Sequence, residues 1–433
     1  MIETALDIKL TLTITVHRVQ ASTASTTDHN EISDATLTAH TADLIAVPRS
    51  APANSFVLHA PLELLARTAL LPYIDPATRH HARERITEIA VSYASFEPAD
   101  FPARHRAFEG VVHAVAHLVD AMRANDLAGA DEAADWLGTH LSPIELTDAL
   151  ADSILGSLAA AAHAPIFFWL ARRVNPRSNL TGRLLRPLVR ELTRHSAKQL
   201  RWIDTPTSDA PTLAIPAATG NDMTAALAAT PRLGEGPSNS IAPTMSRVDS
   251  AELATALLGP VCGTGEIGDR GRAVMRAAAW SMLGESPTHS AYGWTHALTM
   301  SQAAIGIAGS CDRPSRALAT AATYVMGFRA SLAVNPLIDG FEPDRVVAPL
   351  SEAFSDGPDA AAAAAWHFPV ERRAELITHL ATGAAAHPDA HQAKYTLACL
   401  DAVGDDPPSA RLYLTAAAKL AGYWTSIATP NEH

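Results

Sequence analysis

Six of the nineteen histidines lie within apolar stretches of the chain, where an imidazole that needs two hydrogen-bond partners is costly to bury alone. A shared metal ion is one economical solution, because neutral imidazole is the commonest metal ligand in proteins. The alternative is that each ring finds its own partner in the core. The six are His59, His113, His117, His163, His296 and His391.

The segment "EGVVHAVAHLVD" has the most regular histidine spacing. In a helix, Glu109, His113 and His117 share one face at i, i+4 and i+8, with Asp120 nearby. Two histidines one turn apart can chelate one ion, and a neighbouring carboxylate can hold a ring N–H. An amphipathic helix without a metal shows the same spacing, so the pattern leaves both interpretations open.

Three further apolar segments contain one histidine each. His59 lies one turn before Glu63 in "LHAPLEL", and His163 lies between small and aromatic residues in "AAAAHAPIFFWLA". His296 follows a Gly-Trp pair and opens a helix in "GWTHALTM". Packing or capping explains each of these histidines when it is taken singly, whereas one common site explains them all.

Lys394 is one of only four lysines in a chain whose positive charge comes mostly from arginine. In "HPDAHQAKYTLACL", Asp389 is placed to cap a helix on which His391, Lys394 and Tyr395 share a face. The simple interpretation is a lysine whose ammonium reaches solvent. A metal would repel that ammonium, so beside one the lysine would have to lose its proton or become a carbamate, an anionic oxygen ligand.

Composition excludes several classes of protein. The net charge of −12 and a pI near 5.8 argue against nucleic-acid binding, which needs a basic face. The three scattered cysteines form neither a disulfide framework nor a zinc knuckle. The start "MIETALDIKL" does not resemble a signal peptide, and the apolar window 154–171 contains His163 and Pro165. We therefore expect a buried core helix there, a cytoplasmic protein, and no membrane or nucleic-acid partner.

The hydrophobic pattern predicts a mainly α, multi-helical bundle. Residues 1–54 are expected to be extended, with one strand over 7–18. Residues 55–203 show helical periodicity and form a first helical half, which holds His59, His113, His117 and His163; Ser142 is its clearest N-cap. Residues 204–250 are rich in Pro, Gly and Ser and are expected to be a long loop or linker. Residues 251–433 form the second half, which holds His296, His391 and Lys394.

Several motifs of well-defined chemistry are missing from the sequence. There is no HExxH of a zincin protease and no His-Asp dipeptide of an HD-type phosphohydrolase. No GxSxG elbow and no Walker A sequence occur. No GxGxxG follows a predicted strand, so no built-in nicotinamide or flavin domain is expected.

In the order of its histidine and lysine segments, the chain resembles the questin oxidase-like family. "SFVLHAPLELLARTALL", "VVHAVAHLVDAM", "AAAAHAPIFFWLARRV" and "GWTHALTMSQAAIGI" are similar to its successive histidine segments. "DAHQAKYTLACLDA" resembles its D-x-H-x-x-K-x-x-x-A-C-L signature, the most specific of the set. Ala114 stands where the family has a proline, the asparagine–histidine flank is missing near His59, and residues 1–54 have no counterpart.

The resemblance implies an oxygenase for fused aromatic polyketides such as anthraquinones, with a mononuclear non-haem iron, Fe(II), and O2. It implies that the metal is held largely by histidines, with a lysine that can be carbamylated completing the sphere. Carried over to this chain, the implied metal ligands are His59, His117, His163, His391 and Lys394. His113 and His296 are implied close by, and we expect one of them to move a proton or polarise a substrate oxygen.

Three hypotheses follow from the sequence. The first is the iron-dependent oxygenase, which opens or oxidises an aromatic ring. The second is a zinc- or manganese-dependent hydrolase that uses the same histidines around a metal-bound water. The third is a non-catalytic helical protein that binds a small molecule and whose histidines only pack. Metal content and dependence on O2 separate the three, while the substrate and the oligomeric state stay open.

Overall fold

The computed structural model describes residues 32–47, 49, 55–98, 106–174, 180–204, 218–234, 241–263, 267–337, 340–344 and 348–428. This part of the chain forms nineteen α-helices, and its only β-type pairings are two isolated bridges, so the prediction of a mainly α protein is confirmed. The strand predicted at 7–18 lies outside the described residues.

The amino-terminal part contains ten helices in the described residues. They are α1 Asp34–Ala46, α2 Ser55–Leu70, α3 Arg79–Ala94, α4 Val111–Arg123, α5 Leu127–His140, α6 Pro143–Ile154, α7 Ala164–Arg173, α8 Leu180–Arg194, α9 Gly220–Ala228 and α10 Ile241–Ser250. The carboxy-terminal helices are α11 Leu253–Cys262, α12 Gly268–Gly284, α13 Thr295–Gly306, α14 Pro314–Leu332, α15 Leu350–Ser355, α16 Pro358–Trp366, α17 Arg373–Ala386, α18 Ala390–Asp405 and α19 Ala410–Ala428.

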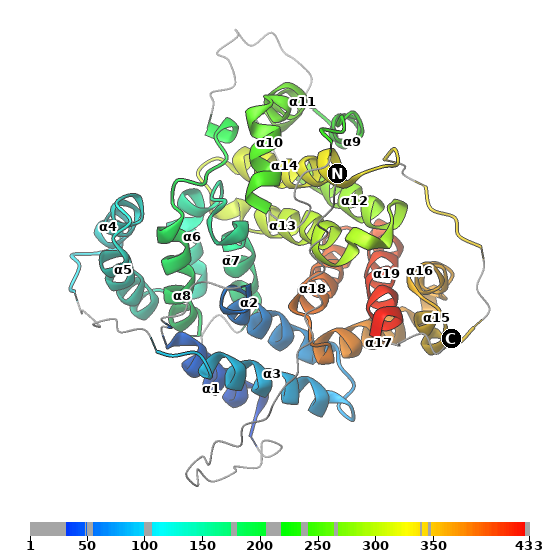
Figure 1. The fold of residues 1–433 in the computed structure, drawn as a ribbon, viewed down its shortest axis with the longest axis horizontal. Coiled ribbons are helices and arrows are strands. Elements are labelled where there is room, and N and C mark those ends of the chain that lie inside the picture. Colours follow the sequence, from blue (N-terminus) through cyan, green and yellow to red (C-terminus); the bar gives the residue numbers. More distant parts are fainter. Residues whose placement is uncertain are drawn as a thin grey trace, which may run out of the picture.

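The centre of the molecule is formed by α2, α7, α13 and α18 (Figure 1). Helix α2 packs against α7 and α18, and α13 packs against the same two helices. The two predicted helical halves therefore share one apolar core, which runs through the described chain from α1 to α19. Residues more than 300 positions apart in sequence are brought together at this centre.

Two segments that we expected to be irregular contain helices. Within 1–54, α1 begins after Ser33, whose hydroxyl accepts from the Thr36 N–H, and it buries Leu37 and Ile45 on one face. Within 204–250, α9 begins with a capping box between Thr219 and Asp222. The expectation of a 204–250 loop was wrong for α9 and α10. Thr219 acts as the cap of α9, and α10 buries an apolar face formed by Ile241, Met245 and Val248.

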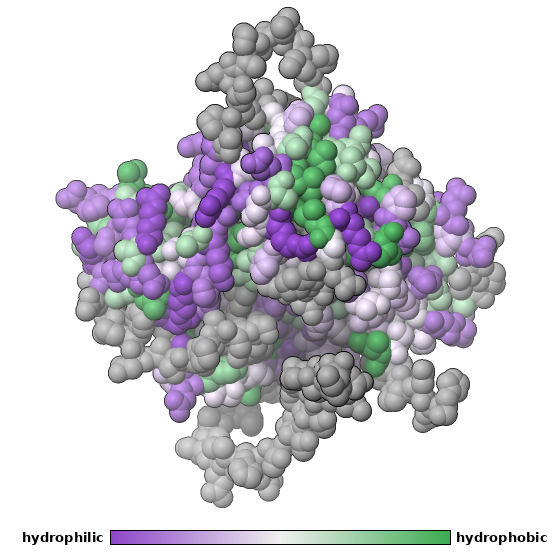
Figure 2. All heavy atoms as spheres, turned by 45° about the horizontal axis from the view of Figure 1, so that its top comes forward, coloured by the Kyte–Doolittle hydropathy of each residue, from purple (hydrophilic) through white to green (hydrophobic). Residues whose placement is uncertain are grey.

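The apolar window 154–171 is buried but is not one helix. Helix α6 starts with the predicted Ser142 cap, completed by Glu145, and ends at Ile154. A short turn, Ala159–Ala162, separates it from α7, which starts after His163. In the described part of the chain, no helix is both long and apolar enough to cross a membrane. On the face in Figure 2, polar residues cover most of the coloured surface, and one apolar area lies in its upper middle.

A buried ion pair joins α2 to the carboxyl end of α17. The Arg67 guanidinium is fully buried and bonds the Glu63 carboxylate one turn earlier on α2. It also donates to the backbone carbonyls of Ala384, Ala385 and His387, at the point where α17 ends. Since His59 lies one turn before Glu63 and α18 starts three residues after His387, this pair sets how α2 lies against the start of α18.

We expect Arg67→Met to lower the free energy of unfolding by about 3–5 kcal/mol, because three helix-end carbonyls lose their buried donor and Glu63 keeps only Arg85 as its partner. Urea unfolding followed by far-UV circular dichroism measures this change. The control is Arg313→Met, whose exposed pair with Asp204 should cost less than about 1 kcal/mol. Equal losses in the two variants would show that the Arg67 network does not hold these helices together.

Candidate metal centre

Three histidines meet at the centre of the helix bundle. One ring nitrogen from each of His59, His163 and His391 lies within 4.8 Å of the other two, and this is the single such group of potential metal ligands found in the described residues. His59 comes from α2, His163 from the residue that precedes α7, and His391 from the first turn of α18. His163 and His391 are buried, whereas His59 is partly exposed.

Two of the ring nitrogens lie at the separation that a shared ion would impose. His59 Nε2 and His163 Nε2 are 3.2 Å apart. Metal–nitrogen bonds of about 2.0–2.1 Å that meet at a roughly tetrahedral or right angle place their donor atoms about 3–3.5 Å apart. The pair therefore fits two ligands of one metal ion.

In His163, His391 and His296, a hydrogen bond to an oxygen atom fixes which ring nitrogen carries the proton. His163 Nδ1–H donates to Ala161 O at 2.7 Å, and His391 Nδ1–H donates to Asp389 Oδ1 at 2.8 Å. His296 Nδ1–H donates to the carbonyl oxygen of Tyr292. Each bond leaves Nε2 as the unprotonated nitrogen, which is the form that binds a metal.

His296 is a fourth imidazole of the same cluster. Its ring centroid lies 5.4 Å from that of His163 and 4.9 Å from that of His391. Its Nε2 is buried and has no hydrogen-bond partner. A buried nitrogen without a partner is costly unless a ligand or a substrate satisfies it, so His296 belongs to the site, although it does not join the tight group of three.

Burial keeps the four imidazoles neutral. It lowers the pKa of His59, His163 and His296 well below the usual value for histidine, and it lowers the pKa of His391 as well. The neighbouring Lys394 charge acts in the same direction on all four rings. Neutral rings are the form that binds a metal, so these nitrogens need not lose a proton first.

Lys394 extends into this cluster rather than to solvent. Its Nζ lies 3.5 Å from His163 Nε2, and only 3% of the residue is exposed. Burial lowers the pKa of Lys394 to about 8, although the carboxylates of Asp389 and Glu63 act in the opposite direction. A substantial fraction of the lysine is therefore a neutral amine near pH 8, and the interpretation of a solvated helix lysine is wrong.

Asp389 organises the start of α18. Its carboxylate caps the helix through the His391 N–H and holds the His391 ring through Nδ1, while the Tyr292 hydroxyl donates to its other oxygen at 3.0 Å. These bonds outweigh the cost of burial and lower the pKa of Asp389 to about 2. The sequence identified Asp389 as a cap but not as a partner of the His391 ring; Tyr292, four residues before His296, was missed.

His113 and His117 lie elsewhere. Helix α4 packs on α5 at the edge of the molecule, away from α2 and α18 (Figure 1). His113 is exposed, and both rings contact Phe108 at 5.8 and 5.3 Å between centroids. Arg106 donates to His117 Nδ1. Placing His117 among the metal ligands and His113 at the reaction centre was wrong, because the i, i+4 spacing reflects an amphipathic helix.

The turn before His163 has an unusual backbone. Ala160, Ala161 and Ala162 all have positive φ, between 50° and 57°. This left-handed conformation costs residues other than glycine roughly 1–2 kcal/mol each. The carbonyl oxygens of Ala160 and Ala161 accept the hydrogen bond from His163 Nδ1, so the costly turn is also the element that orients this ring.

Comparison of the chain with protein-family models, with curated proteins and with solved structures finds no match. The residues of the site themselves indicate which metals suit it. The donor set consists of imidazole nitrogens and one lysine, and imidazole suits iron, copper, nickel and zinc. Calcium and magnesium prefer oxygen ligands, so the group does not favour them.

We expect Asp389→Asn to weaken metal binding by roughly 10–100-fold, because the amide holds the His391 ring less firmly than the carboxylate does. Competition with a chromophoric chelator, using Fe(II) under anaerobic conditions and then Zn(II), measures this affinity. Asp405→Asn, at the other end of α18, is the control and should leave the affinity unchanged. An Asp389 variant with wild-type affinity would contradict the role given to this carboxylate.

We expect Ala161→Gly to raise the free energy of unfolding by about 1 kcal/mol, since glycine adopts the left-handed conformation without strain. Ala161 is partly exposed, so removal of its methyl group leaves little cavity. Ala116→Gly, at an exposed position within α4, is the control and should lower stability by about 0.5–1 kcal/mol. Opposite signs in urea unfolding support the left-handed turn, and a loss in both variants contradicts it.

Proposed function

We propose that this chain is a metal-dependent oxygenase, with a non-haem iron held by His59, His163 and His391, that oxidises or opens a ring of a fused aromatic polyketide or anthraquinone-like substrate with O2. The observation that carries the proposal is the convergence of three neutral imidazole nitrogens within 4.8 Å. The order of the histidine and lysine motifs, which resembles that of the questin oxidase-like family, supports the choice of reaction.

Iron, when bound, supplies the one-electron chemistry that lets O2 react with a closed-shell aromatic molecule. The chain itself provides binding, orientation and proton handling. Asp389 and the carbonyl of Ala161 hold the protons on Nδ1 of His391 and His163, so that both rings keep Nε2 free. His296 Nε2 is buried and unpartnered, and it is the atom that we propose accepts a hydrogen bond or a proton from a substrate hydroxyl.

Lys394 has two forms in this proposal. As a neutral amine it can attack the carbon of CO2, and the loss of one proton from the nitrogen leaves an anionic carbamate. The lowered pKa, near 8, makes the amine available for this reaction. The carbamate would add a negative oxygen to a donor set that otherwise contains only neutral imidazoles, and so would offset part of the charge of the metal.

A cavity of about 520 Å³ beside α18 is the proposed place for an aromatic substrate. Gln392, which follows His391, lines it together with His387, Phe354 and Trp424. The Trp424 ring also packs edge to face against Tyr292, which in turn contacts His391. Aromatic walls of this kind stack well on planar molecules.

The location that we propose for this activity is the cytoplasm. All three cysteines are free and buried. Free thiols suit a reducing compartment, in which disulfides are rare.

We expect purified protein loaded with Fe(II) under anaerobic conditions to hold about one iron per chain, as measured by elemental analysis. His163→Ala should lose most of this metal, because it removes one of the three nitrogens of the group. His117→Ala is the matched control, since it removes a histidine that the structure places outside the site, and it should keep its metal. A wild-type chain that stays metal-free after loading would overturn the proposal.

We expect the iron-loaded chain to consume O2 in the presence of a hydroxylated anthraquinone, as followed with an oxygen electrode and by loss of the substrate absorbance. Lys394→Met should abolish this turnover, whereas Lys198→Met, at an exposed position, should not change it. Turnover that is independent of O2 and as fast with Zn(II) would instead identify a hydrolase.

A further inference from the structure

A second cavity, of about 670 Å³, lies between α1, α2 and the facing ends of α7 and α8. Thr68 of α2 and Arg173 of α7 line it. They follow His59 and His163 by nine and ten residues along their helices, which at 1.5 Å per residue places them about 14–15 Å from the histidine cluster. The cavity is therefore separate from the candidate metal centre.

The walls of this cavity are mostly apolar. Leu71, Val174 and Leu180 line it with alanines of α1 and α2. The two threonine hydroxyls in the lining, those of Thr38 and Thr68, each donate to a carbonyl of their own helix, and their oxygens lie 3.2 Å apart. These hydroxyls already have partners, so the middle of the cavity is suited to an apolar body.

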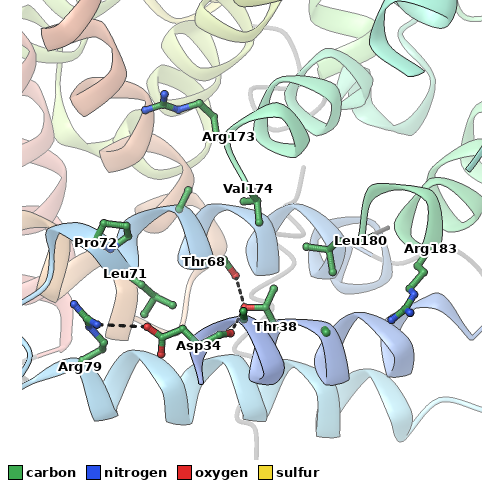
Figure 3. Close-up of a pocket in the computed structure, with 13 residues that line it drawn as sticks. Asp34, Thr38, Thr68, Leu71, Pro72, Arg79, Arg173, Val174, Leu180 and Arg183 are labelled. Atoms are coloured by element: carbon green, nitrogen blue, oxygen red, sulfur yellow. Dashed lines mark hydrogen bonds and ion pairs between the residues drawn. The ribbon is translucent and has the colours of Figure 1, made fainter. Parts of the chain in front are cut away.

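Three arginines lie at the rim of the cavity. Figure 3 shows Arg79 and Arg183 at opposite ends of the cavity and Arg173 above it. Asp34 is the single carboxylate among the lining residues. Each of these guanidinium groups has a carboxylate partner: Arg173 pairs with Asp401, Arg183 with Asp43 and Arg79 with Asp34. Arg79 shares Asp34 with Arg83, so it is the rim arginine with most to gain from a further anion.

Arg79 is the arginine with the weakest existing contacts. Its bonds to Asp34 Oδ2 and to the carbonyl of Ile74 are both 3.5 Å long. Its Nε is buried and has no hydrogen-bond partner. Asp34 is held in addition by Arg83. A carboxylate at this end of the cavity would give Arg79 the two-pronged partner that its guanidinium now lacks.

We propose that this cavity binds a small organic anion with an apolar body, a carboxylate of the fatty-acid type, whose charged end meets Arg79 and whose chain lies along the apolar walls. The volume falls in the range of about 300–1,000 Å³ that is usual for small-molecule sites. Such a ligand would contact α1, α2, α7 and α8 together, so its binding stabilises the fold by mass action. The proposal does not depend on the function of the histidine cluster.

Isothermal titration of the full chain with decanoate, and with uncharged decan-1-ol as the matched ligand, tests the proposal. We expect saturable one-to-one binding of decanoate, and at least tenfold weaker binding of the alcohol. Arg79→Gln should weaken decanoate binding about tenfold or more and leave that of the alcohol unchanged. Ala39→Phe, which fills the cavity from its α1 side, should abolish the binding of both ligands.

The controls separate this site from the rest of the molecule. Arg194→Gln changes an arginine of similar exposure that pairs with Glu191 outside the cavity, and it should bind decanoate like the wild type. His163→Ala should also bind decanoate normally, so a failure of the proposed oxygenase function leaves this result intact. Equal affinity for decanoate and the alcohol, no effect of Arg79→Gln, or no binding at millimolar decanoate would each overturn the proposal.

Discussion

The buried pair of Glu63 and Arg67 is the constraint on which the arrangement of the central helices depends. A charge that is removed from water needs partners for all of its donors, and Arg67 finds them in one carboxylate of α2 and in the last carbonyls of α17. Those carbonyls would otherwise be unpaired at a buried helix end. One side chain therefore fixes the approach of α2 to α17, and through the short connection after His387 it fixes the start of α18.

The histidine cluster follows from this arrangement. His59 is carried by α2 and His391 by the first turn of α18, so the approach of these two helices brings their rings together. His163 reaches them from a left-handed alanine turn, and His296 from the start of α13. In three of the four rings an oxygen atom accepts a hydrogen bond from Nδ1–H. Each of these rings therefore has Nε2 as its free nitrogen donor.

The same helices connect the two sites of the molecule. Helices α2 and α7 contribute His59 and His163 near their amino ends, and Thr68 and Arg173 near their carboxyl ends. Arg173 also pairs with the buried Asp401 of α18, which follows Lys394 by seven residues. Rigid helices can thus present nitrogen donors at one end and guanidinium groups at the other, with an apolar core between them.

The sequence by itself determined the helical class, the Ser142 and Asp389 caps, and the set of apolar-segment histidines with Lys394 from which the cluster is drawn. These features depend on local periodicity and on residues a few positions apart, so they can be derived from spacing. Spacing defines one face of a helix and does not say what lies opposite that face. For this reason His113 and His117 looked as suitable as His59 and His163, and only the packing of α4 on α5 placed them outside the site.

Tertiary structure decided the features that join residues far apart in sequence. The left-handed alanine turn, the contact of Tyr292 with Asp389, the buried Arg67 and the arginine-rimmed cavity each join residues whose distance in space is unrelated to their distance in sequence. Even the helix α1, within a segment rich in Ser and Thr, is stabilised mainly by the apolar face that it buries against α3 and α8. A helix that depends on packing more than on propensity becomes evident only when its partners are in place.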